Sequence, residues 1–479
     1  MHWRSPVPLL RLTKAAAVSA VMVAAALAVP LIADGEPLED GSLPCHPTGA
    51  QSRYLVLFTE VTSPEGASHE MTLACGSTVA YYPEIAVGVA TSGDPRFAER
   101  IGRDRAFSTE AVEAASGRHG RQAAPVTTGG GDDTAVDRSG EQWDMDLIKA
   151  GAAHAVSTGS KGVLVGVLDS GIDATHPDLA HAVDPSKSAG CVSGKADQSP
   201  QAWAPTTSVH GTHVAGIIAA ADDGLGITGV APGVRLASVK VVDDDGTVRP
   251  ESVVCGLMWA AANGMAVANN SYFVDPWPLT CDRGEEHVVF EAVRRAADHA
   301  TSRGVLTVAA ASNEERDLAS PSGQTAGPGG QWRTLDSSCR VLPAGLRGVV
   351  AVSAVGPDRV KAGYSAYGLG VIDVTAPGGE QSSGRCVLST VPGGYAQVCG
   401  TSMAAPHVSG VAALLASTHP GASPQQLMRL LTSQATSIAC PTDYDLDGTG
   451  GQDAYCSGYA PFNSFYGHGM VDALAAVTP

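Results

Sequence analysis

The chain has 479 residues, of which 44% are hydrophobic and 16% charged, and 56 of them are glycine. This composition is typical of a globular protein with one large domain and smaller parts, and it argues against a disordered chain. The formal net charge of −18 argues against nucleic acid or an anionic membrane surface as the natural partner.

The N-terminus has the layout of a secretory signal peptide, expected over residues 1–28. Three basic residues precede the uncharged run 15–33, and residues 26–28 (Ala-Leu-Ala) have the small-x-small form of a cleavage site. A retained membrane anchor is the alternative, because an uncharged run of about 19 residues can just span a bilayer. Pro30 and the cleavage motif favour the signal, which predicts a secreted, extracellular protein without membrane contact after signal cleavage.

Ten cysteines fit an exported chain, since an even number in an oxidising compartment suggests disulfides. None shows the CxxC spacing of a zinc site, which leaves metal ligation as the weaker alternative. Local spacing makes Cys386–Cys399 and Cys440–Cys456 the easiest pairs, although the full connectivity is not deducible from sequence. Cys45 and Cys75 lie apart from the other eight, which suggests that they pair within a separate segment.

After the signal, residues 29–116 form a first block. Its segments RYLVLFTEV and STVAYYPEIAVGVAT are strand-like, and DPRFAERIGRD predicts a short helix, a pattern typical of a small α/β module. Residues 117–142 are rich in Gly, Thr, Asp and Arg and lack periodicity, so we expect an exposed linker that is open to proteolysis. Its arginines are Arg118, Arg121 and Arg138.

From 143 to 479, Val- and Ala-rich strands alternate with helices. This alternation predicts an α/β fold with a buried parallel sheet flanked by helices on both faces. Such sheets place their sites at the carboxyl ends of the strands. The expected strands are 162–169, 235–242, 265–271, 305–311 and 349–355. The expected helices are 211–221, 250–263, 285–303, 402–417 and 424–435.

Polar residues interrupt this pattern at the ends of the elements. Asp169 ends the strand VLVGVLD, His210 begins the helix HGTHVAGIIAAA, and Asn313 follows the strand TVAAAS. Taken singly, Asp169 could be a solvated strand end and Asn313 a turn residue. Functionally, a carboxylate can fix the tautomer of an imidazole base, and an amide can donate to an oxyanion. We interpret His213, one turn after His210, as a packed structural histidine.

Ser402 lies in GTSMAAPHVSG, at the start of an expected helix. An N-cap would explain a serine there, because its hydroxyl can accept from the free amides of the first turn. A nucleophile explains it too, since a turn into a helix presents the hydroxyl beside free backbone donors. The order Asp169, His210, Ser402, each in a glycine-punctuated motif, favours the nucleophile.

The motifs VLDSGI, HGTHVAG, AAASN and GTSMAAP, in this order, resemble those of the subtilisin-like serine proteases. GVAPGVRLASVKV, after the histidine helix, is similar to that family as well. The resemblance covers about residues 143–479, the expected catalytic domain. It implies a serine endopeptidase with catalytic Asp169, His210 and Ser402 and with Asn313 as an oxyanion donor. It also implies polypeptide substrates and no cofactor for the chemistry, and we expect a monomer.

The resemblance implies that four residues lie in the substrate groove, and at these positions the sequence departs from the family pattern. The family usually has glycine where Ser312 stands, and it often has Ser-Leu-Gly-Gly where this chain has Ser271, Tyr272 and Phe273. Backbone pairing with an extended substrate can survive such changes. The preferred substrate side chain cannot be carried over, because bulky residues replace the glycines.

Calcium is a further expectation, because members of this family often bind it. Asp443, Asp445 and Asp447 alternate before Gly448 as in an oxygen-ligand loop, although Ala454 stands at the twelfth position where such loops have glutamate. The alternative is a solvated acidic loop tied by a disulfide.

The first block also fits the family, whose members are commonly made with an inhibitory, chaperone-like pro-segment. The resemblance implies that residues 29–116 are this pro-segment and that 117–142 hold the processing site. Two rival hypotheses stay open. One is a dedicated maturation protease for one partner protein. The other is an inactive binding scaffold, against which the intact set of Asp169, His210, Ser402 and Asn313 argues.

Overall fold

The computed structural model describes residues 44–48, 50–116, 136–326, 332–446 and 449–478. Residues Cys45–Pro479 form one compact unit. The expected signal peptide, most of the expected linker and Asp447 lie outside the described residues. Among the helices that can be described, none has the length and apolar character needed to cross a membrane.

The first block is a four-stranded antiparallel sheet, in the order β2-β3-β1-β4, with three helices. Its expected strands and its helix α2 are present, whereas α1 was not predicted. The Ser63 side chain caps α1 by accepting from the Gly66 amide, and Pro64 opens it, which is a recognisable start signal. The elements are β1 Ser52–Leu57, α1 Pro64–Leu73, β2 Ser77–Tyr82, β3 Val87–Ser92, α2 Phe97–Ile101, β4 Ala106–Phe107 and α3 Thr109–Ser116.

One face of this small sheet packs on α8 (Pro250–Ala262) and α9 (Glu286–Ser302). Leu55 and Leu57 share a buried apolar cluster with residues of these helices. Arg295 of α9 donates from Nη1 to the carbonyl oxygen of Phe58 at 3.1 Å. Apolar packing and hydrogen bonds to the backbone therefore hold the block in place.

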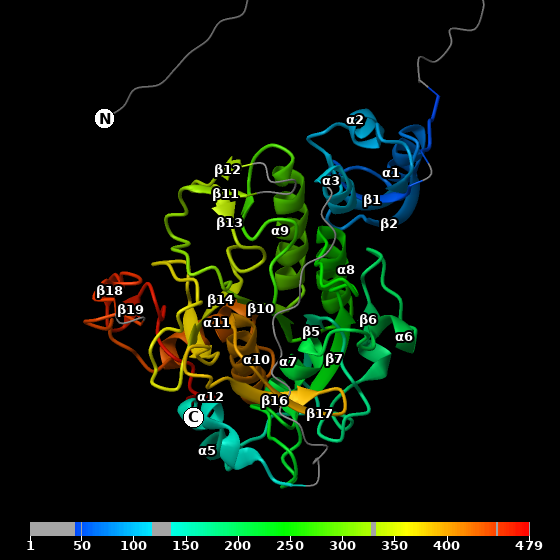
Figure 1. Ribbon diagram of the computed structural model, residues 1–479. Helices are drawn as coiled ribbons and strands as arrows, with labels where there is room; N and C mark the ends of the chain where they lie inside the picture. Colours follow the sequence, from blue (N-terminus) through cyan, green and yellow to red (C-terminus); the bar gives the residue numbers. More distant parts are fainter. Residues whose placement is uncertain (1–43, 49, 117–135, 327–331, 447–448, 479) are drawn as a thin grey trace, which may run out of the picture. The chain divides into compact units, whose positions relative to one another are not determined.

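The main sheet has seven parallel strands in the order β15-β14-β10-β8-β5-β7-β6 (Figure 1). The prediction of a parallel sheet is confirmed, and each of the five expected strands is present. The order of the strands was not predicted. The strands are β5 Leu164–Asp169, β6 Ala189–Gly190, β7 Arg235–Lys240, β8 Val267–Asn270, β10 Leu306–Ala310, β14 Val350–Val355 and β15 Val374–Pro377.

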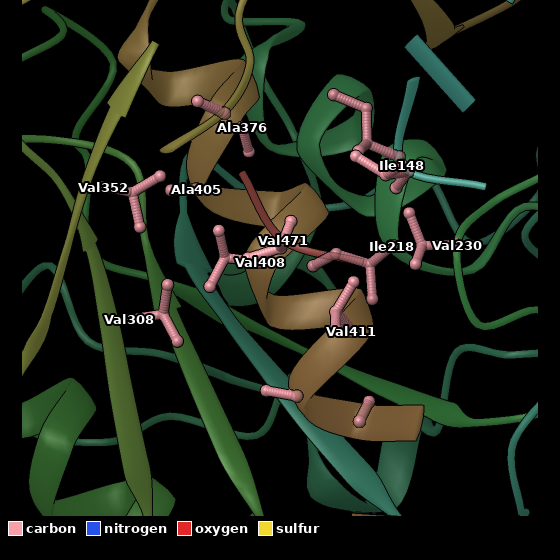
Figure 2. Packing of buried hydrophobic residues seen from close by; sticks show 14 of the residues in the cluster. Ile148, Ile218, Val230, Val308, Val352, Ala376, Ala405, Val408, Val411 and Val471 are labelled. Carbon is pink, nitrogen blue, oxygen red and sulfur yellow. The ribbon is translucent and has the colours of Figure 1, made fainter. Parts of the chain in front are cut away.

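Each face of the main sheet has its own core. Val165 and Val167 pack with α7 (His210–Ala219) and α10 (Thr401–Thr418), whereas Leu164 and Leu168 pack with α8 and α9. Successive strand residues point to opposite faces, so burial of both faces gives the continuous apolar runs seen in the sequence. Figure 2 shows α10 running through the first core, with Val408 and Val411 among the side chains of that core.

The helices after the first block are the five expected ones and several short ones, which lie in connections together with four pairs of short strands. The five expected helices, the last of which is α11 (Pro424–Gln434), begin and end within two residues of their predicted bounds. The other helices of this part are η1 Ser139–Glu141, α4 Trp143–Leu147, α5 Ala150–His154, η2 Pro185–Lys187, α6 Pro200–Trp203 and α12 Ala473–Val477. The paired strands are β9 Thr280–Cys281 with β13 Cys339–Arg340, β11 Gln324–Ala326 with β12 Trp332–Thr334, β16 Val387–Val391 with β17 Gly394–Val398, and β18 Gly458–Tyr459 with β19 Phe462–Asn463.

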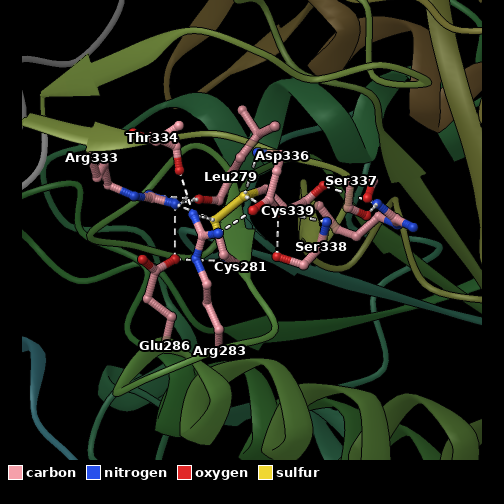
Figure 3. Close-up of a disulfide and its surroundings, with 11 residues drawn as sticks. Leu279, Cys281, Arg283, Glu286, Arg333, Thr334, Asp336, Ser337, Ser338 and Cys339 are labelled. Atoms are coloured by element: carbon pink, nitrogen blue, oxygen red, sulfur yellow. Dashed lines mark hydrogen bonds and ion pairs between the residues drawn. A yellow bond between two sulfur atoms is a disulfide. The ribbon is translucent and has the colours of Figure 1, made fainter.

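All ten cysteines form disulfides. The expected pairs Cys386–Cys399 and Cys440–Cys456 are confirmed, and so is the pairing of Cys45 with Cys75 inside the first block. Cys191–Cys255 and Cys281–Cys339 complete the set. Figure 3 shows Cys281–Cys339 beside Arg333 and Glu286, which form an ion pair at 2.8 Å. The Cys281–Cys339 disulfide and the Arg333–Glu286 ion pair tie the loops after β10 to the start of α9.

Candidate active site

Three neighbouring strands end at the polar residues singled out in the sequence. Asp169 ends β5, Ser271 follows β8, and Asn313 follows β10. The register pairs Leu168 with Asn270 and Asn270 with Ala309, so the three strands end at the same edge of the sheet. Carboxyl ends of parallel strands form the usual site in such folds, and the sequence prediction of its location agrees with this arrangement.

His210 is the first residue of α7 and contacts the strand-end carboxylate. Its Nδ1 lies 2.8 Å from Asp169 Oδ1 and 3.0 Å from Oδ2, and Asp169 is 1% exposed. A carboxylate only accepts, so Nδ1 carries a proton, and in the neutral form of the ring the lone pair lies on Nε2. Burial lowers the pKa of His210, but the charge and the hydrogen bond of Asp169 together raise that pKa above 6.5.

Ser402 lies in the first turn of α10 and exchanges two hydrogen bonds with Ser271. Its Oγ donates to the Ser271 carbonyl oxygen at 3.0 Å, and Ser271 Oγ donates to the Ser402 carbonyl oxygen at 2.8 Å. Pro406 explains the second bond. It stands four residues after Ser402 and has no N–H, so the Ser402 carbonyl lacks its regular helix donor. The Ser271 hydroxyl supplies one instead.

Asn313 is exposed and is oriented by Thr401. Its Oδ1 accepts from the Thr401 amide at 2.9 Å and from Thr401 Oγ1 at 2.7 Å, and its Nδ2 has no hydrogen-bond partner among the described residues. A Cβ built on Gly400 would lie 3.2 Å from Asn313 Nδ2 and 3.6 Å from the Ser402 amide nitrogen. The missing side chain of Gly400 therefore leaves a space flanked by two N–H groups, as an oxyanion requires.

The four residues expected in the substrate groove follow the strands β8 and β10 and differ in environment. Ser271 exchanges two hydrogen bonds with Ser402, as described above. Tyr272 and Phe273 are partly buried against the core of α8 and α9, and the Tyr272 hydroxyl donates to Asn270 Oδ1 at 2.6 Å. Ser312 is 6% exposed and has a positive φ of 104°, a conformation that favours glycine. The family pattern of glycine at this position fits that backbone.

His213 is the packed histidine that the sequence analysis favours. It is fully buried, and its Nε2 faces the carbonyl oxygens of Val387 at 3.2 Å and Ala396 at 3.1 Å. Burial first, and then the charge of His210, lower the pKa of His213 to about 3. His213 is therefore neutral at physiological pH and supports the β16–β17 hairpin.

The acidic loop near the C-terminus uses its carboxylates internally. Asp443 Oδ1 accepts from Gln452 Nε2 at 2.6 Å. Asp445 accepts from the amides of Thr449 at 3.0 Å and Gly450 at 2.7 Å. Asp447 lies outside the described residues. The two carboxylates that are described thus accept hydrogen bonds from donors of the loop itself.

Sequence reasoning missed several residues that shape the site. Thr401, Gly400 and Pro406 surround Ser402 in the chain, and their roles depend on contacts with Asn313 and Ser271. Two signals were available. A proline four residues after an expected helix start predicts a carbonyl without its helix donor, and a glycine before the expected nucleophile predicts a close approach.

An α/β sheet with a histidine–carboxylate contact and two N–H groups beside a helix-terminal serine is the arrangement expected of a serine hydrolase. A family model described as the subtilase family matches residues 160–469. Subtilisin BL of Lederbergia lenta is 37% identical over 306 residues, 63% of this chain and 94% of that protein. Subtilisin E of Bacillus subtilis (strain 168) is 37% identical over 297 residues, 61% of this chain and 66% of that protein.

Solved structures agree with these sequence matches. A lanthipeptide protease is 25% identical with a TM-score of 0.55, covering 71% of this chain and 94% of that one. A mutant of the epidermin leader peptide processing serine protease from Staphylococcus aureus has a TM-score of 0.64 at 20% identity. That match covers 89% of this chain and 99% of the other, and it shows likeness of fold alone. The chain belongs to the subtilase family of serine endopeptidases.

Proposed function

We propose that this chain hydrolyses peptide bonds through an acyl-enzyme formed on Ser402. Ser402 Oγ attacks the scissile carbonyl carbon and its proton passes to His210 Nε2, which returns it to the leaving amine as the C–N bond breaks. Water then attacks the ester with His210 again as base, and the acid product and free Ser402 are released. Asp169 orients His210 throughout. The observation that carries this proposal is the Asp169–His210 contact, because it leaves Nε2 as the base.

The developing oxyanion is held by Asn313 Nδ2 and the Ser402 amide. Both groups flank the space left by Gly400, and Thr401 fixes the orientation of the Asn313 amide. The start of α10 adds its positive dipole end at the same point. No step in this mechanism uses a cofactor.

Labelling with a fluorophosphonate probe tests the mechanism. We expect the wild type to be labelled on Ser402 and inactivated, and Ser402→Ala to be neither labelled nor active. Iodoacetamide should have no effect, because all ten cysteines are in disulfides. A folded wild type without labelling would favour the inactive binding scaffold.

We infer further that the chain is a secreted pro-enzyme that removes its own first block. Residues 1–28 serve as signal peptide, and 29–116 serve as pro-segment, supported by the block's packing on α8 and α9. The last residues of the linker, however, are docked: Gln142 is 3% exposed and exchanges two hydrogen bonds of 2.9 Å with the Thr228 backbone. Arg138 pairs with Glu141 at 2.8 Å. We therefore place the cut before Val136, at or near Arg118 or Arg121.

Expression of Ser402→Ala tests self-processing. The variant should accumulate with its first block attached, about 10 kDa heavier than the mature wild type, a chain-length estimate for about 100 residues. A tethered chain has a high effective concentration at the site, so the cut is made in cis. Released block added back should inhibit the mature enzyme. If Ser402→Ala is trimmed like the wild type in a host without extracellular proteases, another protease makes the cut.

A second candidate is a dedicated maturation protease that cuts one partner protein. It is favoured by the structural neighbours, which include a lanthipeptide protease and an epidermin leader peptide processing protease. A cleavage profile separates the two candidates. Broad hydrolysis of denatured casein supports a general endopeptidase, whereas cleavage restricted to one leader-type sequence supports the maturation protease.

Calcium at the acidic loop stays a prediction. An ion there would require Asp443 and Asp445 to exchange their present donors for it. Bound calcium would stabilise the folded state by mass action, so a chelator would then lower the melting temperature and Asp445→Asn would abolish that effect.

A further inference from the structure

A second histidine–carboxylate pair lies in the core, apart from the proposed triad. His407 stands on α10 five residues after Ser402, and Asp144 stands on α4, just after the expected linker. Both side chains are fully buried, with His407 Nε2 3.0 Å from Asp144 Oδ2. Asp144 Oδ1 is buried and has no hydrogen-bond partner in the described part of the chain. His407 therefore supplies the hydrogen bond that the Asp144 carboxyl group makes in the described part of the chain.

The geometry fixes where the protons lie. His407 Nδ1 is 2.7 Å from the carbonyl oxygen of Met403, which can only accept, so Nδ1 carries a proton. Nε2 faces the carboxyl group of Asp144, so a second proton is held between these two atoms. The ring therefore donates on one side while the pair shares a proton on the other, and both bonds lie in a low-dielectric core that strengthens them.

These bonds act on the turn that carries the nucleophile. The carbonyl oxygens of Ser402 and Met403 each receive a side-chain donor, the first from Ser271 and the second from His407. The Met403 carbonyl lies one residue beyond Ser402, whose amide and hydroxyl perform the proposed chemistry. His407 therefore fixes the backbone of that turn from the core side, and Ser271 fixes it from the sheet side.

The segment that carries Asp144 is itself held in place. Gln142 is bonded to the Thr228 backbone, and Trp143 Nε1 donates to the Cys386 carbonyl oxygen at 3.1 Å. Cys386 forms the disulfide with Cys399, which directly precedes Gly400. Two routes thus connect this segment to the start of α10.

We propose that Asp144 is a positioning residue, which acts through His407 to hold the first turn of α10 in the geometry needed for turnover at Ser402. This inference rests on the proposed function of Ser402. It assigns a role in turnover to the segment that becomes N-terminal after processing. Substrate binding is not expected to depend on it, because neither side chain reaches the surface.

The test compares Asp144→Ala and Asp144→Asn with Leu431→Ala, a buried α11 residue that serves as control for lost stability. All are assayed as mature enzyme well below their melting temperatures, per site titrated with a fluorophosphonate. A misplacement of about 1 Å can cost about 10²-fold in rate, so we expect Asp144→Ala to lower kcat at least about tenfold with KM within about twofold. Asp144→Asn keeps a hydrogen bond to the ring, so this variant should fold, and its kcat should fall less than that of Asp144→Ala. Leu431→Ala should keep the wild-type kcat.

A second readout reports the shared proton directly. In the inactive Ser402→Ala protein, proton NMR should show two exchange-protected ring N–H signals for His407, and Asp144→Asn should lose one of them. A wild-type kcat in both Asp144 variants overturns the proposal, and so does an equal loss in Leu431→Ala. Failure of the proposed function is distinguishable, because it would appear as activity in Ser402→Ala or as an unlabelled wild type.

Discussion

The two polar atoms of the Asn313 side chain have different tasks in the proposed mechanism: Oδ1 fixes the orientation of the amide, and Nδ2 is the oxyanion donor. Oδ1 accepts two hydrogen bonds from Thr401, and Nδ2, which has no partner in the described part of the chain, lies with the Ser402 amide beside the space at Gly400. The Thr401 contact orients the amide before a substrate arrives. Preorganised donors of this kind stabilise a transition state because they need no rearrangement when the charge develops.

Replacing Asn313 by Ala should lower kcat by about 10²–10³ with little change in KM, because one oxyanion donor is lost. Thr401→Val is the matched control, since it removes the Oγ1 bond to Asn313 and keeps the backbone bond. We expect Thr401→Val to lose less than about tenfold. Steady-state kinetics on the mature enzyme measures both. Equal losses in the two variants would assign Asn313 a structural role instead.

At the scale of the elements, α10 is a buried helix whose first turn is irregular. Pro406 removes one helix hydrogen bond, and the sheet supplies the missing donor from Ser271. Hydrogen bonds between Ser402 and Ser271 thus attach the first turn of α10 to the end of β8. This arrangement couples the position of Ser402 to the sheet edge where Asp169 and Asn313 also lie.

A double-mutant cycle tests this coupling. Ser271→Ala leaves the Ser402 carbonyl without its donor, at a cost of about 1–3 kcal/mol, and should lower kcat about tenfold. Pro406→Ala restores a backbone N–H that can bond to the same carbonyl. The double variant should therefore recover most of the activity lost in Ser271→Ala. Strictly additive losses in kcat would contradict the compensation.

At the scale of the whole molecule, charged residues of the first block affect the pKa of a buried glutamate of α8, Glu251. Glu251 is 2% exposed, and burial raises its pKa to about 7 although Arg53 of the block and Arg249 oppose the rise. Glu110 of the block adds a smaller upward contribution. The folded state binds the proton of Glu251 more tightly than an unfolded chain with a pKa near 4.5, so this contribution to stability is complete below pH 4.5 and is lost as the pH rises through about 7.

Glu251→Gln, made in the unprocessed Ser402→Ala protein, should remove this dependence. The variant and its parent should melt alike near pH 4.5, and above pH 7 the variant should be more stable by up to about 3 kcal/mol, or a few °C. Calorimetry at the two pH values measures the difference. Glu60→Gln, at an exposed position, is the control. A constant difference between variant and parent at both pH values would show that Glu251 does not titrate in this range.

Local patterns in the sequence predict the fold class, five strands of the main sheet and five helices, and they single out the residues proposed for the site. Strand and helix periods are local properties, and Asp169, His210, Asn313 and Ser402 each stand in a short motif at the end of an element. The disulfides Cys386–Cys399 and Cys440–Cys456 were also predictable, because each pair closes a short loop.

Which groups form hydrogen bonds with these residues depends on the tertiary structure. The Asn313–Thr401 bond joins residues 88 positions apart, the Ser271–Ser402 exchange spans 131, and the His407–Asp144 pair spans 263. Such contacts depend on the order of the strands and on side-chain direction, neither of which a local pattern contains. The backbone at Ser312 and the space at Gly400 are of the same kind, since a residue's type does not state what lies beside it in the fold.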